Sequence, residues 1–215
     1  MIGLIGKKLG QTRVYDASGT AIPVTVVLAG PNYVVQKKTV ESDGYNAVQL
    51  GFGSQKESRL TKAAIGHLGK SKVPAVRKLR EFRDYTLDVK PGDVVPVNVF
   101  AEGDYVDAIG ITKGRGFEGV VKRHGFRGGD MTHGAKGWHR RSGAIGQRLF
   151  PGTVMRGMRM PGHMGQVQRT TQNLRVVKVI EADHLLLIEG AIPGAAGEIV
   201  IIRESKKRPK VAAKK

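Results

Sequence analysis

The chain has 215 residues, with 36 Lys and Arg against 18 Asp and Glu, a formal net charge of +18 and no cysteine. This length suits one medium domain or two small ones, and a hydrophobic fraction of 40% supports a packed core, so an entirely disordered chain is excluded. The lack of cysteine excludes disulfides, thiolate zinc sites and cysteine nucleophiles, and it fits a reducing compartment.

The excess of positive charge indicates a polyanionic partner, and nucleic acid is the commonest polyanion in a cell. An anionic membrane is the alternative. However, the sequence has neither a basic amphipathic helix of the required length nor an apolar run long enough to cross a bilayer. The first residues, Met1–Lys8, place apolar side chains before lysines, which is the reverse of a secretory signal. We therefore predict a cytoplasmic protein that does not act at a membrane.

The first half of the chain is rich in short β-branched runs. Strands are predicted at residues 22–28, 33–38 and 47–52, because turn-forming residues at positions 30–32 and 42–44 separate them. A short helix is predicted around residues 60–68, where apolar residues recur at helical spacing. After a Pro-Gly-Asp turn at position 91, two further strands are predicted at residues 94–100 and 105–111.

The pattern changes in residues 112–169. This stretch holds 14 of the 30 glycines, four of the six histidines and 12 Lys and Arg against two acids, and no Asp or Glu occurs from Met131 to Ile180. A segment of this length without regular structure is uncommon inside a compact domain unless it has a function. One short helix is predicted within it, at Gly116–His124.

A second β-rich block follows, with strands predicted at residues 174–180, 185–189 and 199–203. Short strands at close spacing, separated by turns, are typical of a small barrel or a sandwich, and the pattern leaves both open. The last residues, 205–215, carry six Lys and Arg and no acid, which predicts a disordered basic tail.

The four histidines of the central segment are the first candidates for a metal site. His124, His133, His139 and His163 are separated by nine, six and 24 residues, with no carboxylate or cysteine at ligand spacing. No common metal geometry has this spacing, so we predict no metal and interpret the imidazoles as exposed or stacked on RNA.

Two other patterns are weak indications of an enzyme, one for nucleotide binding and one for acid–base catalysis. The glycines of residues 114–119 resemble a dinucleotide fingerprint, but neither a parallel βαβ unit nor a downstream ribose-binding acid is evident. Asp107, Glu118 and Asp130 are candidate acids near the basic segment, but no spacing pairs them as general acid and base. We predict that the chain is not an enzyme and has no cofactor.

The basic segment itself has two interpretations, a solvated face or an RNA-binding surface. A solvated face mixes both signs of charge, whereas this segment excludes acids for fifty residues and has six arginines to one lysine between Met131 and Arg169. Guanidinium groups bind phosphate with two hydrogen bonds and stack on bases, and glycines let the backbone approach a ligand closely. Trp138 is a candidate stacking residue on a base or sugar, with packing in the protein core as its alternative.

Several stretches resemble the bacterial large-subunit ribosomal protein L3 family, and together they span essentially the whole chain. The matching stretches are Gly3–Thr12, Phe100–Asp107, Gly110–Phe117, Gly119–Phe126, Ser142–Gln147, Pro151–Gly152 and Ala191–Gly194.

The resemblance implies a translation-protein-like β-barrel body on the solvent side of the large subunit, with a long finger that threads into 23S rRNA towards the peptidyl-transferase centre. It also implies binding near the 3′ end of this RNA early in assembly, with ribosomal proteins L14 and L19 as neighbours. By matching motif, residues Lys113, Arg115, Lys122, Arg123 and His124 would contact RNA where the finger leaves the barrel, and Gln147, Arg148 and Arg156 would lie near the tip. Some relatives carry a methylated glutamine two residues before the Pro-Gly, but this position is Leu149 here.

We therefore predict a mainly β protein with a small closed barrel from residues 1–111 and 170–204, including the helical insertion around residues 60–68, an extended RNA-penetrating finger of residues 112–169 and a basic tail of residues 205–215. We predict a structural constituent of the large subunit that is not a homo-oligomer. The predicted rRNA-binding residues are Lys7, Lys8, Lys113, Arg115, Lys122, Arg123, His124, Arg127, Lys136, Trp138, His139, Arg140, Arg141, Gln147, Arg148, Arg156, Arg159, His163 and Arg169. The alternatives are a barrel enzyme acting on RNA or a nucleotide, and a free polyanion-binding protein.

Overall fold

The computed structural model describes residues 1–208, so residues 209–215 of the predicted basic tail lie outside the described residues. The chain forms two compact units. The first, called here the barrel unit, comprises residues 1–111 and the chain from Gln168 onward, and the second, the insertion, comprises residues 112–167. The insertion begins and ends at neighbouring positions, because Ile111 and Gln168 are paired residues of two adjacent strands.

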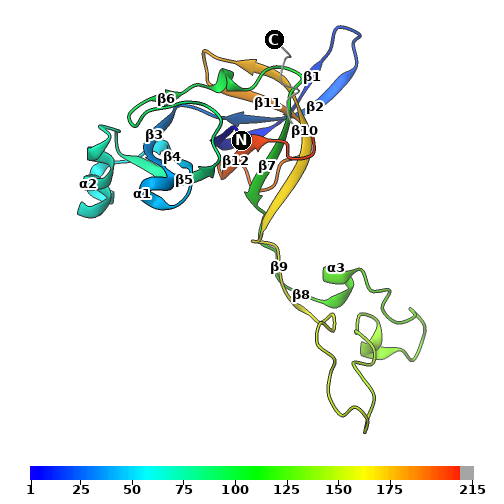
Figure 1. The fold of residues 1–215 in the computed structure, drawn as a ribbon. Coiled ribbons are helices and arrows are strands. Elements are labelled where there is room, and N and C mark those ends of the chain that lie inside the picture. The colour runs from blue at the N-terminus through cyan, green and yellow to red at the C-terminus, as the bar shows by residue number, and fades with distance from the viewer. Residues whose placement is uncertain (209–215) are drawn as a thin grey trace. The chain divides into compact units, whose positions relative to one another are not determined.

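Six antiparallel strands of the barrel unit close into a barrel (Figure 1). Around the barrel the order is β1 (Gly3–Tyr15), β12 (Ile199–Glu204), β7 (Tyr105–Ile111), β10 (Gln168–Ile180), β11 (Leu185–Glu189) and β2 (Ala21–Leu28). Branched aliphatic side chains from these strands fill the interior; Val27, Ile188 and Ile202 are each fully buried. Burial of this kind contributes about 25 cal/mol per Å² of apolar surface and holds the barrel closed. The predicted mainly β barrel is confirmed.

A second, four-stranded sheet has the order β5 (Val76–Arg83), β4 (Ala47–Ser54), β3 (Asn32–Lys38) and β6 (Val94–Val95). Leu50, Phe52 and Phe82 of this sheet belong to the same apolar cluster as the interior of the barrel. Four short helical segments accompany the sheet and its connections: α1 (Val40–Asp43), η1 (Glu57–Arg59), α2 (Lys62–Lys70) and η2 (Val97–Val99). Helix α2 covers the sheet through Leu68, which packs in a separate small cluster with Val76.

Asn32 joins the two sheets within the shared core. Its side chain is fully buried, and its amide nitrogen donates to the carbonyl oxygens of Ile5 and Ala29 at 3.0 and 2.8 Å. Its amide oxygen accepts from the Ile5 N–H at 3.0 Å. A buried amide whose donors and acceptor are all paired stabilises the junction, and the same amide left unpaired would cost about 1–3 kcal/mol.

Several sequence predictions differ from the structure. Strands β1 and β5 were not predicted, because glycines interrupt the first and exposed basic residues dominate the second. The strand predicted at residues 94–100 ends at Val95 and continues as η2, since Pro96 has no N–H to donate to a ladder. Packing requires two of the three glycines of β1, because a Cβ on Gly3 would collide with the ring of Phe82 and a Cβ on Gly6 with the side chain of Val27.

The insertion contains little regular structure. Strand β8 (Gly116–Glu118) pairs with β9 (Gly162–Met164), followed by α3 (Val120–His124) and the short η3 (Lys136–Trp138). The helix predicted at Gly116–His124 is therefore wrong over its first three residues, which form β8, and the helix begins at Val120. Within residues 112–167, all of which the structure describes, Val120 is the single buried residue.

Candidate nucleic-acid interface

The cations of the insertion lie almost entirely in solvent. The segment of residues 112–167 carries eleven Lys and Arg against Glu118 and Asp130, and ten of the eleven are exposed, Arg123 being half-buried. Two ion pairs are present in this unit: Lys122 with Glu118 at 2.6 Å and Arg127 with Asp130 at 3.9 Å. Exposed pairs of this kind contribute little to stability, so most of this charge is available to an external anion.

The paired strands β8 and β9 order the two ends of the insertion. Their ladder is extended by backbone hydrogen bonds from Arg115 to Met164 at 2.9 Å and from Thr112 to Val167 at 3.0 Å. The side chains of Lys113 and Arg115 are exposed beside this ribbon. Gly165 has φ +78°, and a Cβ there would collide with the carbonyl oxygen of Lys113, so only glycine lets the two strands approach this closely.

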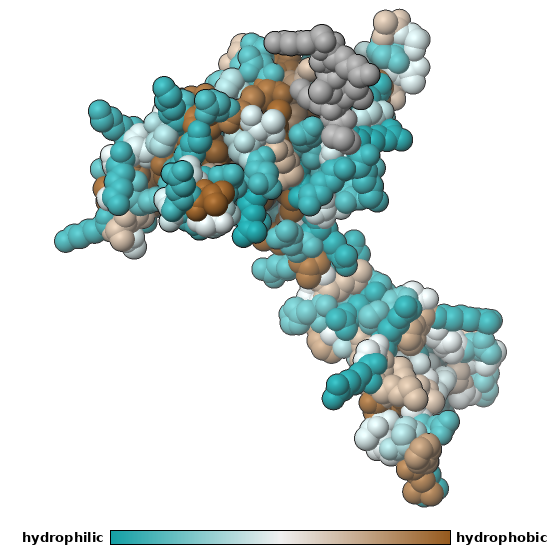
Figure 2. All heavy atoms as spheres, in the orientation of Figure 1, coloured by the Kyte–Doolittle hydropathy of each residue, from teal (hydrophilic) through white to brown (hydrophobic). Residues whose placement is uncertain are grey.

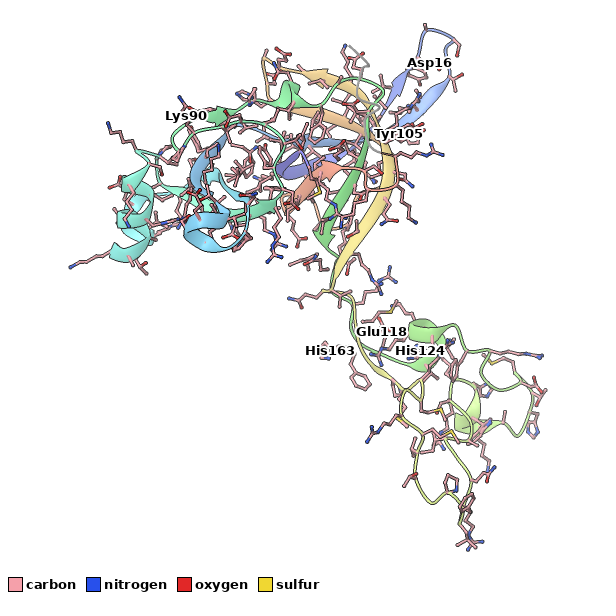
Figure 3. All side chains as sticks on the ribbon, in the orientation of Figure 1. Asp16, Lys90, Tyr105, Glu118, His124 and His163 are labelled. Carbon is pink, nitrogen blue, oxygen red and sulfur yellow. The ribbon has the colours of Figure 1, made fainter. Side chains whose placement is uncertain are left out.

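Arg123 and His124 of α3 are half-buried and bind the protein's own backbone. The Arg123 guanidinium and the His124 ring both contact the carbonyl oxygen of Met160, at 2.7 and 3.0 Å. Figure 3 shows Glu118, His124 and His163, which come from β8, α3 and β9 respectively. The two contacts tie α3 to the chain that leads into β9, and they give Arg123 and His124 a structural role within the insertion.

Trp138 occupies the loop around η3. Its side chain is 51% exposed, and one face of it lies under the guanidinium of Arg141, 5.5 Å from the ring centroid. A Cβ on Gly129 would come within 2.8 Å of the indole, and a Cβ on Gly128, whose φ is +80°, would collide with the carbonyl oxygen of His139. The two glycines therefore let the chain fold closely around Trp138, which leaves half of an aromatic ring and its paired guanidinium facing solvent.

The remaining predicted residues of the insertion are exposed, apart from the half-buried His139. They are Lys136, His139, Arg140, Gln147, Arg148, Arg156, Arg159 and His163. Large apolar side chains are exposed among them, most of all Leu149 at 88% and Phe150 at 84%. Figure 2 shows hydrophobic patches mixed with the hydrophilic surface of this unit.

Three predicted residues belong to the barrel unit, and they differ in exposure. Lys7 and Arg169 are exposed, the latter on strand β10. Lys8 is buried, and its ammonium donates to the carbonyl oxygens of Ile192 and Gly194 at 2.7 and 3.0 Å. In this structure Lys8 therefore holds the loop before β12 against β1, and its charge is directed inward.

The candidate acids do not form a catalytic pair. Asp107 is 1% exposed; one oxygen accepts from Arg203 at 3.2 Å and the other from the backbone N–H of Asn173 at 3.2 Å. Glu118 pairs with Lys122 and Asp130 with Arg127, so each acid offsets a local cation. Among residues 1–208, no group of three His, Asp or Glu side chains is arranged to hold a metal ion, and no helix is long and apolar enough to span a membrane.

Comparison with known proteins gives one consistent family. A sequence model described as Ribosomal protein L3 matches residues 80–185. Among curated proteins, the large ribosomal subunit protein uL3 of Deinococcus radiodurans is 49% identical over 207 residues, which cover 96% of each chain. The uL3 of Koribacter versatilis is 48% identical over 97% of this chain and 88% of the relative, and that of Nitrosococcus oceani is 49% identical over 96% and 97%. These relatives are named as ribosomal proteins and not as enzymes, in agreement with the sequence prediction.

Proposed function

Because the chain belongs to the ribosomal protein L3 family, we propose that it is a structural constituent of the large ribosomal subunit and that its insertion binds 23S rRNA. The observation that carries this proposal is the composition of the insertion's surface. The unit exposes ten of its eleven cations, has two acids and buries one residue.

Folded RNA offers what this surface lacks. Phosphate groups supply the counter-charge, and the bases and sugars supply flat, partly apolar surfaces against which exposed aromatic and aliphatic side chains can pack. The half-exposed Trp138 with its overlying Arg141 presents a stacking face of the kind that unpaired bases occupy. The insertion thus acquires from RNA the packing that its own sequence does not provide.

The proposed contacts follow the exposure of the predicted residues. Arg and Lys side chains that point into solvent bind phosphates, while Arg123 and His124 act mainly by fixing α3 to Met160. Lys8 is left out of the proposed interface, since its ammonium is engaged inside the barrel unit. The proposed rRNA-contacting residues are Lys7, Lys113, Arg115, Lys122, Arg127, Lys136, Trp138, His139, Arg140, Arg141, Gln147, Arg148, Arg156, Arg159, His163 and Arg169.

Membership of the family also supports proposals about where the chain lies in the large subunit and when it joins during assembly. We propose that residues 112–169 form a finger directed towards the peptidyl-transferase centre, and that the chain binds near the 3′ end of 23S rRNA early in assembly of the subunit. Ribosomal proteins L14 and L19 are its proposed neighbours, in the cytoplasm. Co-sedimentation of the protein with the large subunit through a high-salt wash is the expected result, and release by that wash would contradict stable incorporation.

The RNA-binding role is tested by replacing residues 126–158 with a short Gly/Ser linker. This change keeps β8, β9, α3 and the Met160 carbonyl, so the ends of the insertion retain their contacts. We expect an unchanged unfolding midpoint of the barrel unit and a loss of affinity for a 3′ fragment of 23S rRNA. The salt dependence should fall as well, because each neutralised phosphate contributes about 0.7–0.9 to the slope of log K against log salt.

Two results would contradict this role. Normal affinity of the linker variant would show that the insertion is not the main anchor. Equal binding of the wild-type protein to heparin and to the RNA fragment, with no preference for the RNA fold, would indicate a general polyanion-binding protein instead.

A further inference from the structure

The positive charge of the chain is concentrated in a few segments. Residues 112–167 carry eleven Lys and Arg against two acids, residues 56–83 carry nine against two, and residues 205–215 carry six against none. The rest of the chain has ten Lys and Arg against fourteen acids, a net charge of −4. The barrel unit is therefore not uniformly basic: within residues 1–204, its excess of cations lies in residues 56–83.

Residues 56–83 include helix α2 and strand β5, and we name their exposed surface the α2–β5 surface. Its cations lie on several elements and all nine are exposed: Lys56, Arg59, Lys62, Lys70, Lys72, Arg77, Lys78, Arg80 and Arg83. Strand β5 is at the edge of its sheet, with β4 as its neighbour on one side. Lys78 and Arg80 stand opposite Phe52 and Leu50 in the ladder, so they share the barrel-facing side, while Arg77 and Arg83 alternate onto the other side.

The acids of this segment do not neutralise it. Glu81 accepts hydrogen bonds from Lys38 at 2.8 Å and from the Tyr45 hydroxyl at 3.0 Å, and both partners lie outside the surface. Its electrostatic interaction with Arg83 of the surface is the smaller one. Glu57 lies at the start of η1. Across residues 1–208, the ion pairs of the structure involve none of the nine cations.

Protection of a sheet edge from aggregation explains only part of this pattern. Charged side chains on the edge strand itself, especially lysine, prevent edge-to-edge pairing. Here cations also occupy both ends of α2 and the connections on either side of it, far beyond what an edge requires. A partner strand that pairs with β5 would contact only the edge of the sheet. A polyanion could contact the helix, the connections and both sides of the strand.

A hollow of about 420 Å³ within the barrel unit connects this surface with Lys7. Its lining includes Pro31, Tyr33, Phe52 and Pro74, together with Lys7 and Arg77. The two cations therefore stand at one depression, although they are 70 positions apart in the sequence. Lys7 is also one of the residues that we propose to contact rRNA, so this hollow brings one proposed rRNA contact of the barrel unit next to the α2–β5 surface.

We propose that the α2–β5 surface is a second RNA-binding site, which binds the phosphodiester backbone of structured RNA independently of the insertion and extends to Lys7. The site rests on the proposed function, since it takes the same class of ligand. It differs in anchoring the barrel unit itself, with lysines and arginines on a preformed helix and strand. None of its cations from residues 56–83 was predicted from the sequence, because they are interleaved with the apolar residues of α2 and β5.

The test compares three full-length variants that retain the insertion. The site variant carries Arg77→Gln, Lys78→Gln and Arg80→Gln. The control carries Arg13→Gln, Lys90→Gln and Lys178→Gln, which remove the same charge from exposed positions elsewhere in the barrel unit. A third variant, Arg77→Lys with Arg80→Lys, keeps the charge of the site. The unfolding midpoint of each variant is first measured and compared with that of the wild type. Each variant with an unchanged midpoint is then titrated against transcribed 23S rRNA at increasing KCl concentration.

We expect the slope of log K against log salt to fall by about two to three for the site variant, with a loss of affinity on the order of 100-fold at about 0.1 M salt. The control and the charge-preserving variant should remain close to the wild type. If the site variant has the same affinity and the same slope as the control, this inference is overturned while the proposed function stands. An acidic protein segment would then be the partner that fits the surface. Failure of the wild-type protein to bind the RNA would overturn the proposed function as well.

Discussion

The barrel unit and the insertion handle their apolar residues in opposite ways. In the barrel unit, twenty buried residues from the two sheets and their connections form one core, and a buried amide connects the sheets. In the insertion, residues as large as Phe117, Trp138 and Phe150 remain more than half exposed, and the backbone is ordered by short ladders and isolated turns. The barrel unit is therefore stabilised by its own packing, whereas the insertion buries too little apolar surface to be stabilised in the same way.

Truncating a leucine should affect stability strongly in the barrel unit and hardly at all in the insertion. Leu186 of β11 is fully buried, so Leu186→Ala should lower the free energy of unfolding by about 2–5 kcal/mol through lost burial and a cavity. Leu149 is 88% exposed, and Leu149→Ala should change it by less than about 0.5 kcal/mol. Urea denaturation of the free protein measures both. A loss for Leu149→Ala as large as that for Leu186→Ala would mean that the insertion has a core.

Arginines of the insertion should matter to RNA and not to stability. The triple variant Arg140→Gln, Arg148→Gln and Arg156→Gln removes three exposed guanidinium groups. We expect affinity for the 23S rRNA fragment to fall on the order of 100-fold at about 0.1 M salt, with an unchanged unfolding midpoint. The Arg13, Lys90 and Lys178 variant described above is the charge-matched control. Equal affinities of the two variants would show that the arginines of the insertion contribute only through the net charge of the protein.

Removing the buried Asn32 amide should destabilise the barrel unit, as removing a buried apolar side chain does. Asn32→Ala leaves the buried N–H and carbonyl of Ile5 without their partner, and we expect a loss of about 1–3 kcal/mol. The exposed Asn98 provides the control, because Asn98→Ala should be nearly neutral. If Asn32→Ala were as mild as Asn98→Ala, the two sheets would not depend on this amide.

The smallest expected effect concerns pH. The hydrogen bond from Lys38 holds the pKa of Glu81 below its usual range, and the bond from Tyr45 acts in the same direction. A carboxyl with a lowered folded-state pKa stabilises the fold above its unfolded-state pKa, and this contribution is lost as the pH falls through the folded-state value. The wild type should therefore lose slightly more stability than Glu81→Gln between about pH 7 and about pH 3. Denaturant titrations at several pH values measure this difference, and identical pH profiles would show that the pair does not contribute.

Much of the barrel could be predicted because its strands are coded locally. Strands β7 and β11 have the predicted bounds, since each is a short β-branched or aliphatic run between turn residues. Strand β1 was not predicted, because Gly3 and Gly6 interrupt its apolar pattern. Glycine is needed at position 3 because of a residue distant in sequence, since a Cβ there would collide with Phe82.

The candidate interface could be predicted in composition and less well in geometry. An acid-free run of arginines and glycines is visible in the sequence, and most of its cations are exposed. The inward direction of Lys8 and the binding of Arg123 to Met160 depend on chain segments 184 and 37 positions away, which local patterns do not encode. The cations of the α2–β5 surface were overlooked for a similar reason, because folding gathers them from a helix, a strand and the connections between them.

Amide hydrogen exchange, measured with and without the 23S rRNA fragment, tests whether the insertion takes its packing from RNA. Ordering the backbone costs about 1–2 kcal/mol per residue, and the insertion buries too little apolar surface to offset this cost alone. We predict slow exchange in the barrel strands under both conditions, and fast exchange of residues 128–156 that becomes slow when RNA is bound. Strong protection of residues 128–156 in the free protein would contradict the claim that the insertion takes its packing from RNA.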